Sequence, residues 1–174
     1  MNLSNTLLNE AQDRLNSLFN LAITNSAISE FTELFKQPHL AYNQRGKVAA
    51  SALLQNNIIK INATLYSQNT NYFITHIIAH ELAHIMVYQL YGLRVKPHGI
   101  EWQKMMLEVF DLPPKVTHTL DVSEVAMREI TYECACQKVP LSLTRHNKVV
   151  NKRQLYVCRK CKTVLTQVVN VTSC

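Results

Sequence analysis

The chain has 174 residues, of which 47% are hydrophobic and 17% charged, enough for the core of one compact domain with a small additional module. Only three glycines and five prolines are present, which argues against collagen-like, linker-rich and multi-turn all-β architectures. The net charge is +6 and apolar runs are short, so we expect a cytoplasmic protein without a membrane span or a secretion signal.

The first part of the chain predicts one helix and a small sheet. Apolar residues recur at three- and four-residue steps over residues 3–22, as they do on the buried face of an amphipathic helix. From residue 38 to residue 61 the spacing between apolar residues becomes shorter. Residues 39–43, 48–54 and 58–61 have the composition of short strands separated by turns. We expect these three strands to form an antiparallel meander.

The middle of the chain predicts a long helix, a loop and a second helix. Asn71 has the side chain of a helix N-cap, and apolar residues then recur at helical spacing as far as Tyr91. Gly92 suits the position that follows the last turn of a helix. We expect a loop over residues 93–97 and the second helix over residues 99–110.

The long helix carries the sequence His80-Glu81-Leu82-Ala83-His84. Two histidines four residues apart lie on one face of a helix, so both imidazoles can bind a single zinc ion, with Glu81 beside them. The alternatives are a hydrogen-bonded pair of helix histidines and a solvated carboxylate. An apolar stretch seldom contains an unpaired carboxylate, which favours the metal site.

A catalytic zinc site needs a third protein ligand and an open position for water. His98 is the best candidate, because it follows the loop after Gly92 and because Gly99 allows a tight turn before the next helix. His76 lies on the same helix face, but it is about 12 Å from His84 along the helix axis, too far for one ion to bind both. We expect His76 at the surface or behind the ligands.

These ligands predict hydrolysis of an amide bond. Zinc lowers the pKa of its water and polarises a carbonyl, and Glu81 can accept the proton. Three imidazoles most often hold zinc, although manganese and iron are alternatives. His118 and Tyr88 are candidate donors to the oxyanion, and each also suits a structural role.

The last part of the chain is a basic module with paired cysteines. Residues 128–174 hold nine Lys and Arg against two acids, a net charge of +7, whereas residues 1–127 have a net charge of −1. Cys134 and Cys136 form a C-x-C pair, Cys158 and Cys161 form a C-x-x-C pair, and β-prone residues flank both. Four thiolates on two turns predict a zinc ribbon; the alternative is disulfide pairing, which a reducing cytosol disfavours.

Basic residues lie between the two cysteine pairs. Arg145, Lys148, Lys152 and Arg153 are the candidates for contact with nucleic acid, because phosphates dominate sequence-independent affinity. The alternative is a solvated face that only keeps the module soluble.

Several motifs, spread over nearly the whole chain, occur together in one known family. They are Tyr42-Asn43-Gln44-Arg45-Gly46, His80-Glu81-Leu82-Ala83-His84, Pro97-His98-Gly99-Ile100-Glu101-Trp102, Thr117-His118, and the two cysteine pairs with Arg145-His146-Asn147 between them. The combination resembles the SprT family of bacterial proteins, the relatives of eukaryotic Spartan.

The resemblance implies a zincin-like metalloprotease core, in which His80 and His84 bind zinc, Glu81 is the catalytic acid and base, and His98 is the third ligand. It also implies a link to DNA, because Spartan-type members cleave proteins crosslinked to DNA.

We therefore expect an α+β fold, with a zincin-like core of helices and a small antiparallel sheet at residues 1–127 and a zinc ribbon at residues 128–174. The expected function is cleavage of DNA-associated or DNA-crosslinked proteins, by a monomer with one catalytic and one structural zinc ion. The alternative is a non-catalytic, zinc-stabilised protein that binds nucleic acid or the transcription machinery.

Overall fold

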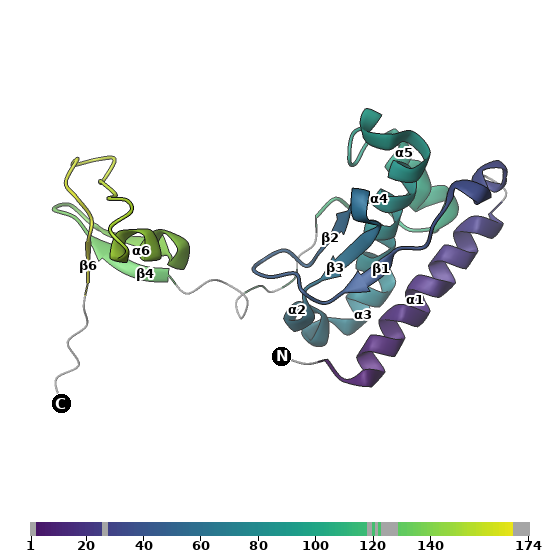
Figure 1. Ribbon diagram of the computed structural model, residues 1–174, viewed down its shortest axis with the longest axis horizontal. Coiled ribbons are helices and arrows are strands. Elements are labelled where there is room, and N and C mark those ends of the chain that lie inside the picture. Colours follow the sequence, from purple (N-terminus) through teal and green to yellow (C-terminus); the bar gives the residue numbers. More distant parts are fainter. Residues whose placement is uncertain (1–2, 26–27, 118–119, 121, 123–128, 169–174) are drawn as a thin grey trace. The chain divides into compact units, whose positions relative to one another are not determined.

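The computed structural model describes residues 3–25, 28–117, 120, 122 and 129–168 (Figure 1). The chain divides into two compact units, Met1–Val125 and Ala126–Cys174, and each has a hydrophobic core of its own. Helices combined with two small sheets confirm the α+β class. None of the helices in the described ranges combines the length and the apolar content needed to cross a membrane.

The first unit begins with the amphipathic helix that the sequence predicts. Helix α1 spans Asn5–Thr24, and the Ser4 hydroxyl at its N-cap accepts a hydrogen bond from the Leu7 amide. Its buried side chains are Ala11, Leu15, Leu18, Phe19 and Ala22. A 3₁₀ turn over Ser29–Leu34 leads from α1 to the sheet.

The sheet of this unit has three short strands, and its topology differs from the predicted meander. Strands β1 (His39–Ala41), β2 (Ala50–Leu53) and β3 (Ile58–Ile61) lie in the order β1-β3-β2. The β2–β3 pair is antiparallel, but β1 pairs with β3 in parallel. The prediction of an all-antiparallel sheet is therefore wrong.

The loop between β1 and β2 explains the parallel pair. Both Ala41 at the end of β1 and Ala50 at the start of β2 lie opposite the last residues of β3, so the loop must cross that end of the strand. Asn62, which is 3% exposed, holds the crossing in place. Its side-chain amide donates to the carbonyls of Gly46 and Val48, and its backbone amide donates to the Ala49 carbonyl.

A series of helical segments follows β3. Helix α2 spans Ala63–Gln68, α3 spans Thr70–Tyr72, a π-helical turn covers Phe73–Ile77, and α4 spans Ile78–Tyr91. Asn69, not Asn71, precedes α3, so the predicted N-cap is wrong; Asn71 lies inside the helix.

Helix α4 is central to the first unit. It contacts β2 and β3 of the sheet as well as α1 and α5 (Figure 1). It ends as predicted at Gly92, whose φ of +65° is a conformation that glycine adopts without strain. Helix α4 therefore connects the sheet with the surrounding helices.

Helix α5 spans Ile100–Lys104 and continues into a second π-helical turn over Met105–Val109. Gly99 precedes it with a φ of −70°, so the expected need for glycine flexibility does not apply. A side chain would instead lack space, because a Cβ at Gly99 would lie 3.1 Å from the Lys96 carbonyl oxygen.

The second unit is a small sheet with one helix. Strands β4 (Glu129–Glu133), β5 (Lys138–Ser142) and β6 (Thr166–Gln167) are antiparallel in the order β5-β4-β6. Helix α6 (Leu143–Val150) is absent from the sequence prediction, because it is short and mostly polar and none of its side chains is fully buried. The Tyr132 hydroxyl lies 3.0 Å from His146 Nδ1 and connects α6 with β4.

Candidate metal centres

Three histidine nitrogens meet at one point in the first unit. Helix α4 carries His80 and His84 one turn apart, and His98 comes from the turn before α5. The Nε2 atoms lie 3.2 Å apart for His80 and His84, 3.1 Å for His84 and His98, and 3.2 Å for His98 and His80. The structure thus brings together the three histidines that the sequence analysis selected as ligands.

This triangle fits a metal ion better than a set of hydrogen bonds. A neutral imidazole nitrogen offers either one hydrogen or one lone pair, so three such atoms cannot all be hydrogen-bonded to one another. A tetrahedral zinc ion with Zn–N distances of about 2.0–2.1 Å holds its nitrogen ligands roughly 3.3 Å apart. The geometry and the imidazole donors therefore suit zinc, and the three ligands leave a fourth position open.

The side chain of Trp102 forms a wall against which the three imidazoles pack. Its ring centre lies 4.8 Å from that of His80, 5.5 Å from that of His84 and 4.7 Å from that of His98. The Trp102 indole nitrogen also donates to the His80 carbonyl at 3.4 Å. Trp102 is fully buried, so it limits the directions in which the imidazoles can rotate.

The environment keeps His84 and His98 neutral. Burial, reinforced by the neighbouring His80 and His98, lowers the pKa of His84 to about 3, although a hydrogen bond to the backbone of Pro97 opposes this shift. Because proline has no backbone N–H, its carbonyl must accept that bond from the His84 ring. Burial also lowers the pKa of His98. Neutral imidazoles are the form that binds a metal.

Glu81 is buried beside the triangle. Its side chain is only 8% exposed, which excludes the alternative of a solvated helix carboxylate. Burial raises the pKa of Glu81 to about 7, and a hydrogen bond with the backbone of Ala52 on β2 partly offsets this effect. A carboxyl group with such a pKa can both accept and release a proton near neutral pH.

A cavity of about 210 Å³ lies beside the site, and His80 and Glu81 both line it. His76 lines it too, and so is neither a simple surface residue nor a ligand in the triangle. Tyr88 lines a separate pocket of about 80 Å³ together with His84. His118, the other candidate oxyanion donor, lies outside the described residues.

The four predicted cysteines of the second unit also meet. Cys134 and Cys136 lie in the turn between β4 and β5, and Cys158 and Cys161 lie in the turn bounded by the Val157–Val164 bridge. All four Sγ atoms are within 4.8 Å of one another, with 3.6 Å between Cys134 and Cys136 and 3.7 Å between Cys136 and Cys158.

These distances fit four thiolates around zinc. The two separations are far beyond the roughly 2.05 Å of a disulfide, and all four cysteines are free, so the structure contains no disulfide within this group. A tetrahedral zinc with Zn–S distances of about 2.3 Å would hold its sulfurs roughly 3.8 Å apart.

The second cysteine pair has the electrostatics of a metal-binding turn. Hydrogen bonds from the hydroxyl and the backbone N–H of Thr163 lower the pKa of Cys161 to about 6. Hydrogen bonds from the backbone of Cys161 and Lys160 lower the pKa of Cys158. Thiolates are the form that binds zinc, so this turn favours binding.

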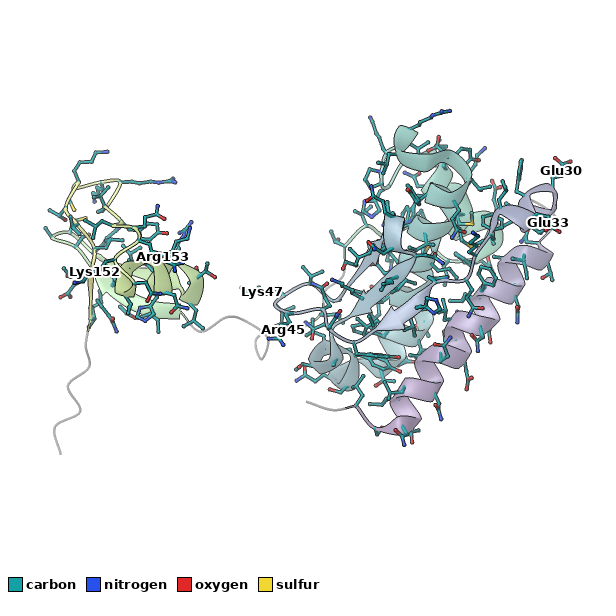
Figure 2. The ribbon with its side chains drawn as sticks, in the orientation of Figure 1. Glu30, Glu33, Arg45, Lys47, Lys152 and Arg153 are labelled. Carbon is teal, nitrogen blue, oxygen red and sulfur yellow. The ribbon has the colours of Figure 1, made fainter. Side chains whose placement is uncertain are left out.

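The four basic residues proposed for nucleic acid are all exposed in the second unit. Arg145 and Lys148 lie on α6, and Lys152 and Arg153 follow its C-terminal end (Figure 2). The Arg145 guanidinium carbon lies 5.8 Å from the ring centre of Tyr156. These four cations occupy one helix and the turn that follows it.

Reasoning from individual residues missed three contributors to the histidine site. Trp102 lies on α5 and His98 in the turn before it, so their contact has no helical spacing in the sequence. The hydrogen bond between Ala52 and Glu81 has no signal in the sequence, because it depends on the placement of β2 beside α4. Tyr72, whose ring stacks on that of His76, is likewise found only in the structure.

Comparison with known proteins identifies a family and several relatives. Residues 20–118 match the model of the SprT-like family. The chain is 42% identical to "Protein SprT" of Vibrio atlanticus over 83% of its own length and 85% of that protein. It is 45% identical to "Protein SprT" of Pasteurella multocida over 78% and 81% of the two chains, and 46% identical to that of Actinobacillus succinogenes over 76% and 77%. No solved structure matches the chain.

Proposed function

The chain belongs to the SprT-like family, and from this membership and the histidine site we propose that it is a zinc-dependent metallopeptidase. We further propose that its substrates are proteins bound or crosslinked to DNA. The peptidase core would lie in the first unit, with a zinc ribbon in the second.

The observation that carries this proposal is the buried carboxyl group of Glu81 beside three converging imidazole nitrogens. His80, His84 and His98 would hold the zinc ion through their Nε2 atoms. Such a ligand set leaves one coordination position for water or substrate, as in catalytic zinc sites. A site that only stabilised the fold would have a fourth protein ligand instead.

The chemistry follows from the groups around the cavity. Zinc, when bound, lowers the pKa of water and polarises a carbonyl group. Glu81 accepts a proton at a carboxylate oxygen from the attacking water and then donates it to the amide nitrogen that leaves. Burial raises the pKa of Glu81 to about 7 in the metal-free site, which favours proton binding by this carboxyl group. The hydrogen bond from Ala52 orients the carboxylate.

Exposed positive charge supports DNA as part of the target. Lys152 and Arg153 project from the second unit, and Arg45 and Lys47 lie on the loop between β1 and β2 of the first (Figure 2). Lys47 directly precedes Val48, which lines the cavity beside Glu81. Cations on both units would contact phosphates, and the resemblance to Spartan-type proteins agrees with such a role.

The test is cleavage of a protein crosslinked to DNA by the zinc-loaded chain. We expect Glu81→Gln to reduce the cleavage rate at least about 100-fold, because the proton acceptor is lost while the histidines remain. Glu108→Gln is the matched control, since Glu108 is an exposed glutamate outside the cavity, and it should retain the full rate. Equal cleavage by the wild type and Glu81→Gln would contradict the proposal.

The alternative is a non-catalytic, zinc-stabilised protein that binds nucleic acid or transcription machinery. The observation in its favour is the concentration of exposed cations on the second unit, which needs no peptidase. If Glu81→Gln cells resemble wild-type cells while charge reversal of those cations produces a phenotype, this alternative is favoured. The burial of Glu81 beside the imidazoles instead favours catalysis.

A further inference from the structure

The cavity beside Glu81 has an apolar wall, and its polar lining consists of His76, His80, Glu81, Lys115 and Thr117. It lies between β2 and the loop before it, the π-helical turn Phe73–Ile77, and residues 113–117. Its apolar lining includes Val48, Ala50, Ile77, Met106, Pro113 and Val116. A water molecule takes up about 30 Å³ in the liquid, so a cavity of about 210 Å³ is large enough for a side chain.

An apolar wall next to the reacting groups favours one kind of occupant. His80 and Glu81 line the same cavity, so a peptide bond held at the zinc site would have a neighbouring side chain within reach of it. Transfer of a leucine or phenylalanine side chain from water to such a wall improves affinity about tenfold or more. A positively charged side chain would lose its hydration there and would meet Lys115, a cation that also lines the cavity.

One wall of the cavity is a stacked pair of rings. The centres of the Tyr72 and His76 rings are 4.8 Å apart with an angle of 15° between their planes, and both residues line the cavity. The two residues are four apart on one helical path, so the stack is a feature of the local backbone.

Thr75 determines which nitrogen of His76 carries the proton. The Thr75 hydroxyl donates its one hydrogen to the Asn71 carbonyl at 2.8 Å. The same hydroxyl oxygen lies 2.7 Å from His76 Nδ1, and in this second hydrogen bond it must be the acceptor. In the neutral ring Nδ1 therefore carries the hydrogen and Nε2 has a free lone pair. Within the described part of the chain, no other hydrogen-bond partner of His76 is present.

We propose that this cavity is the subsite for a large apolar side chain of the protein substrate, and that His76 positions the peptide by accepting a backbone N–H at Nε2. The proposal rests on the proposed peptidase function and adds the class of residue that the enzyme prefers near the cleaved bond. His76 is a positioning residue, because its partner is the bound peptide and the reacting atoms lie at Glu81 and the three ligands.

Peptide binding to zinc-loaded, full-length Glu81→Gln protein tests the subsite without hydrolysis. The probes are fluorescein-labelled octapeptides in sets of four. Within a set the peptides carry Leu, Phe, Ala or Asp at one position and are otherwise identical, and this position moves along the peptide from one set to the next. We expect one position at which Leu or Phe binds at least tenfold more tightly than Ala, because Ala buries less apolar surface there. Val116→Trp, which adds bulk from an exposed part of the lining, should abolish that preference.

Val150→Trp is the matched control, because Val150 is an equally exposed valine of the second unit and does not line the cavity. It should retain the preference. Equal affinities for the four side chains at every position would overturn the subsite, as would a preference that survives Val116→Trp.

The hydrogen bond to His76 is tested with a pair of changes. His76→Phe keeps an aromatic ring on Tyr72 but removes the acceptor, and N-methylation of one peptide amide removes the donor. We expect N-methylation at one amide to weaken binding about tenfold in the protein with His76 and to have no effect with His76→Phe. The absence of such coupling at every amide would overturn the positioning role, as would an NMR spectrum showing hydrogen on Nε2 of His76.

The subsite and the peptidase activity can fail separately. An apolar preference in binding, combined with no Glu81-dependent cleavage by the wild type, would contradict the peptidase activity, on which the subsite's role depends. Glu81-dependent cleavage combined with equal binding of all four side chains would overturn the subsite and leave the peptidase intact.

Discussion

The imidazoles of His80, His84 and His98 are suited to metal binding by their surroundings as well as by their distances. Burial lowers the pKa values of His84 and His98, so both rings are neutral without a metal and no proton need leave when one binds. Trp102 limits the rotation of all three rings, which reduces the entropy lost on binding. The same region raises the pKa of Glu81, because burial disfavours its charge.

Zinc content per chain tests the two sites at the scale of single residues. We expect two zinc ions in the wild type and one in each of His84→Ala and Cys158→Ser, because each variant removes a ligand from one site only. Elemental analysis of the purified proteins measures this directly.

His76→Ala is the matched control, since His76 lies on the same helix path but outside the nitrogen triangle, and it should retain both ions. A wild-type chain with one zinc, lost only in Cys158→Ser, would show that the histidine site does not hold the metal.

Among the structural elements, the π-helical turn Phe73–Ile77 has the clearest consequence. A π-helical turn adds a residue to the helix and changes which backbone carbonyls find partners inside it. Arg14 from α1 binds this turn, since its Nε donates to the Ile74 carbonyl at 2.8 Å. The turn carries Thr75 and His76, so α1 supports the wall of the cavity through this bond.

Removal of this support should destabilise the first unit. We expect Arg14→Met to lower the free energy of unfolding by about 1–2 kcal/mol, because the Ile74 carbonyl loses a charged hydrogen-bond donor in a half-buried place. The melting temperature should fall on the order of 5 °C. Trp102 is the one tryptophan of the chain and is buried in the first unit, so its fluorescence reports that unit's melting.

Arg94→Met provides the comparison for Arg14→Met. Arg94 is exposed, and its replacement should change the free energy of unfolding by less than about 0.5 kcal/mol. If the two variants melt at the same temperature, the bond between Arg14 and the π-helical turn does not support the unit.

Over the whole molecule, positive charge is concentrated in the second unit. Residues 128–174 carry a net charge of +7 and residues 1–127 a net charge of −1. The two parts thus differ in chemistry as well as in fold, with a buried titratable site in one and exposed cations in the other. An electrostatic contact with DNA would come mainly from the second unit and would weaken with salt.

The salt dependence of DNA affinity tests whether the cations of the second unit make the electrostatic contact with DNA. Simultaneous replacement of Arg145, Lys148, Lys152 and Arg153 by glutamate should weaken binding and flatten the slope of log affinity against log salt by about three to four. Fluorescence anisotropy with a labelled duplex measures the slope, and an unchanged zinc content shows that the ribbon is intact.

Replacement of Arg94 and Lys104 in the first unit by glutamate is the control, and it should leave the slope nearly unchanged. A slope that is the same in the fourfold variant and the wild type would assign the exposed cations of α6 and its following turn to solubility alone.

The sequence by itself determined the paired ligands of the two candidate metal centres, because the spacing within each pair is a local property. His80 and His84 are one helical turn apart wherever the helix packs, and each cysteine pair needs only a short turn. The end of α4 at Gly92 and the buried stripe of α1 follow from local signals in the same way.

Only the tertiary structure decided how the site is completed. The parallel β1–β3 pair depends on the loop that Asn62 holds across the sheet, and the bond between Ala52 and Glu81 depends on β2 lying beside α4. The wall that Trp102 forms and the cavity that His76 lines likewise join elements distant in sequence. Such contacts leave no periodic pattern or fixed spacing in the sequence, because they form only when elements distant in sequence pack together.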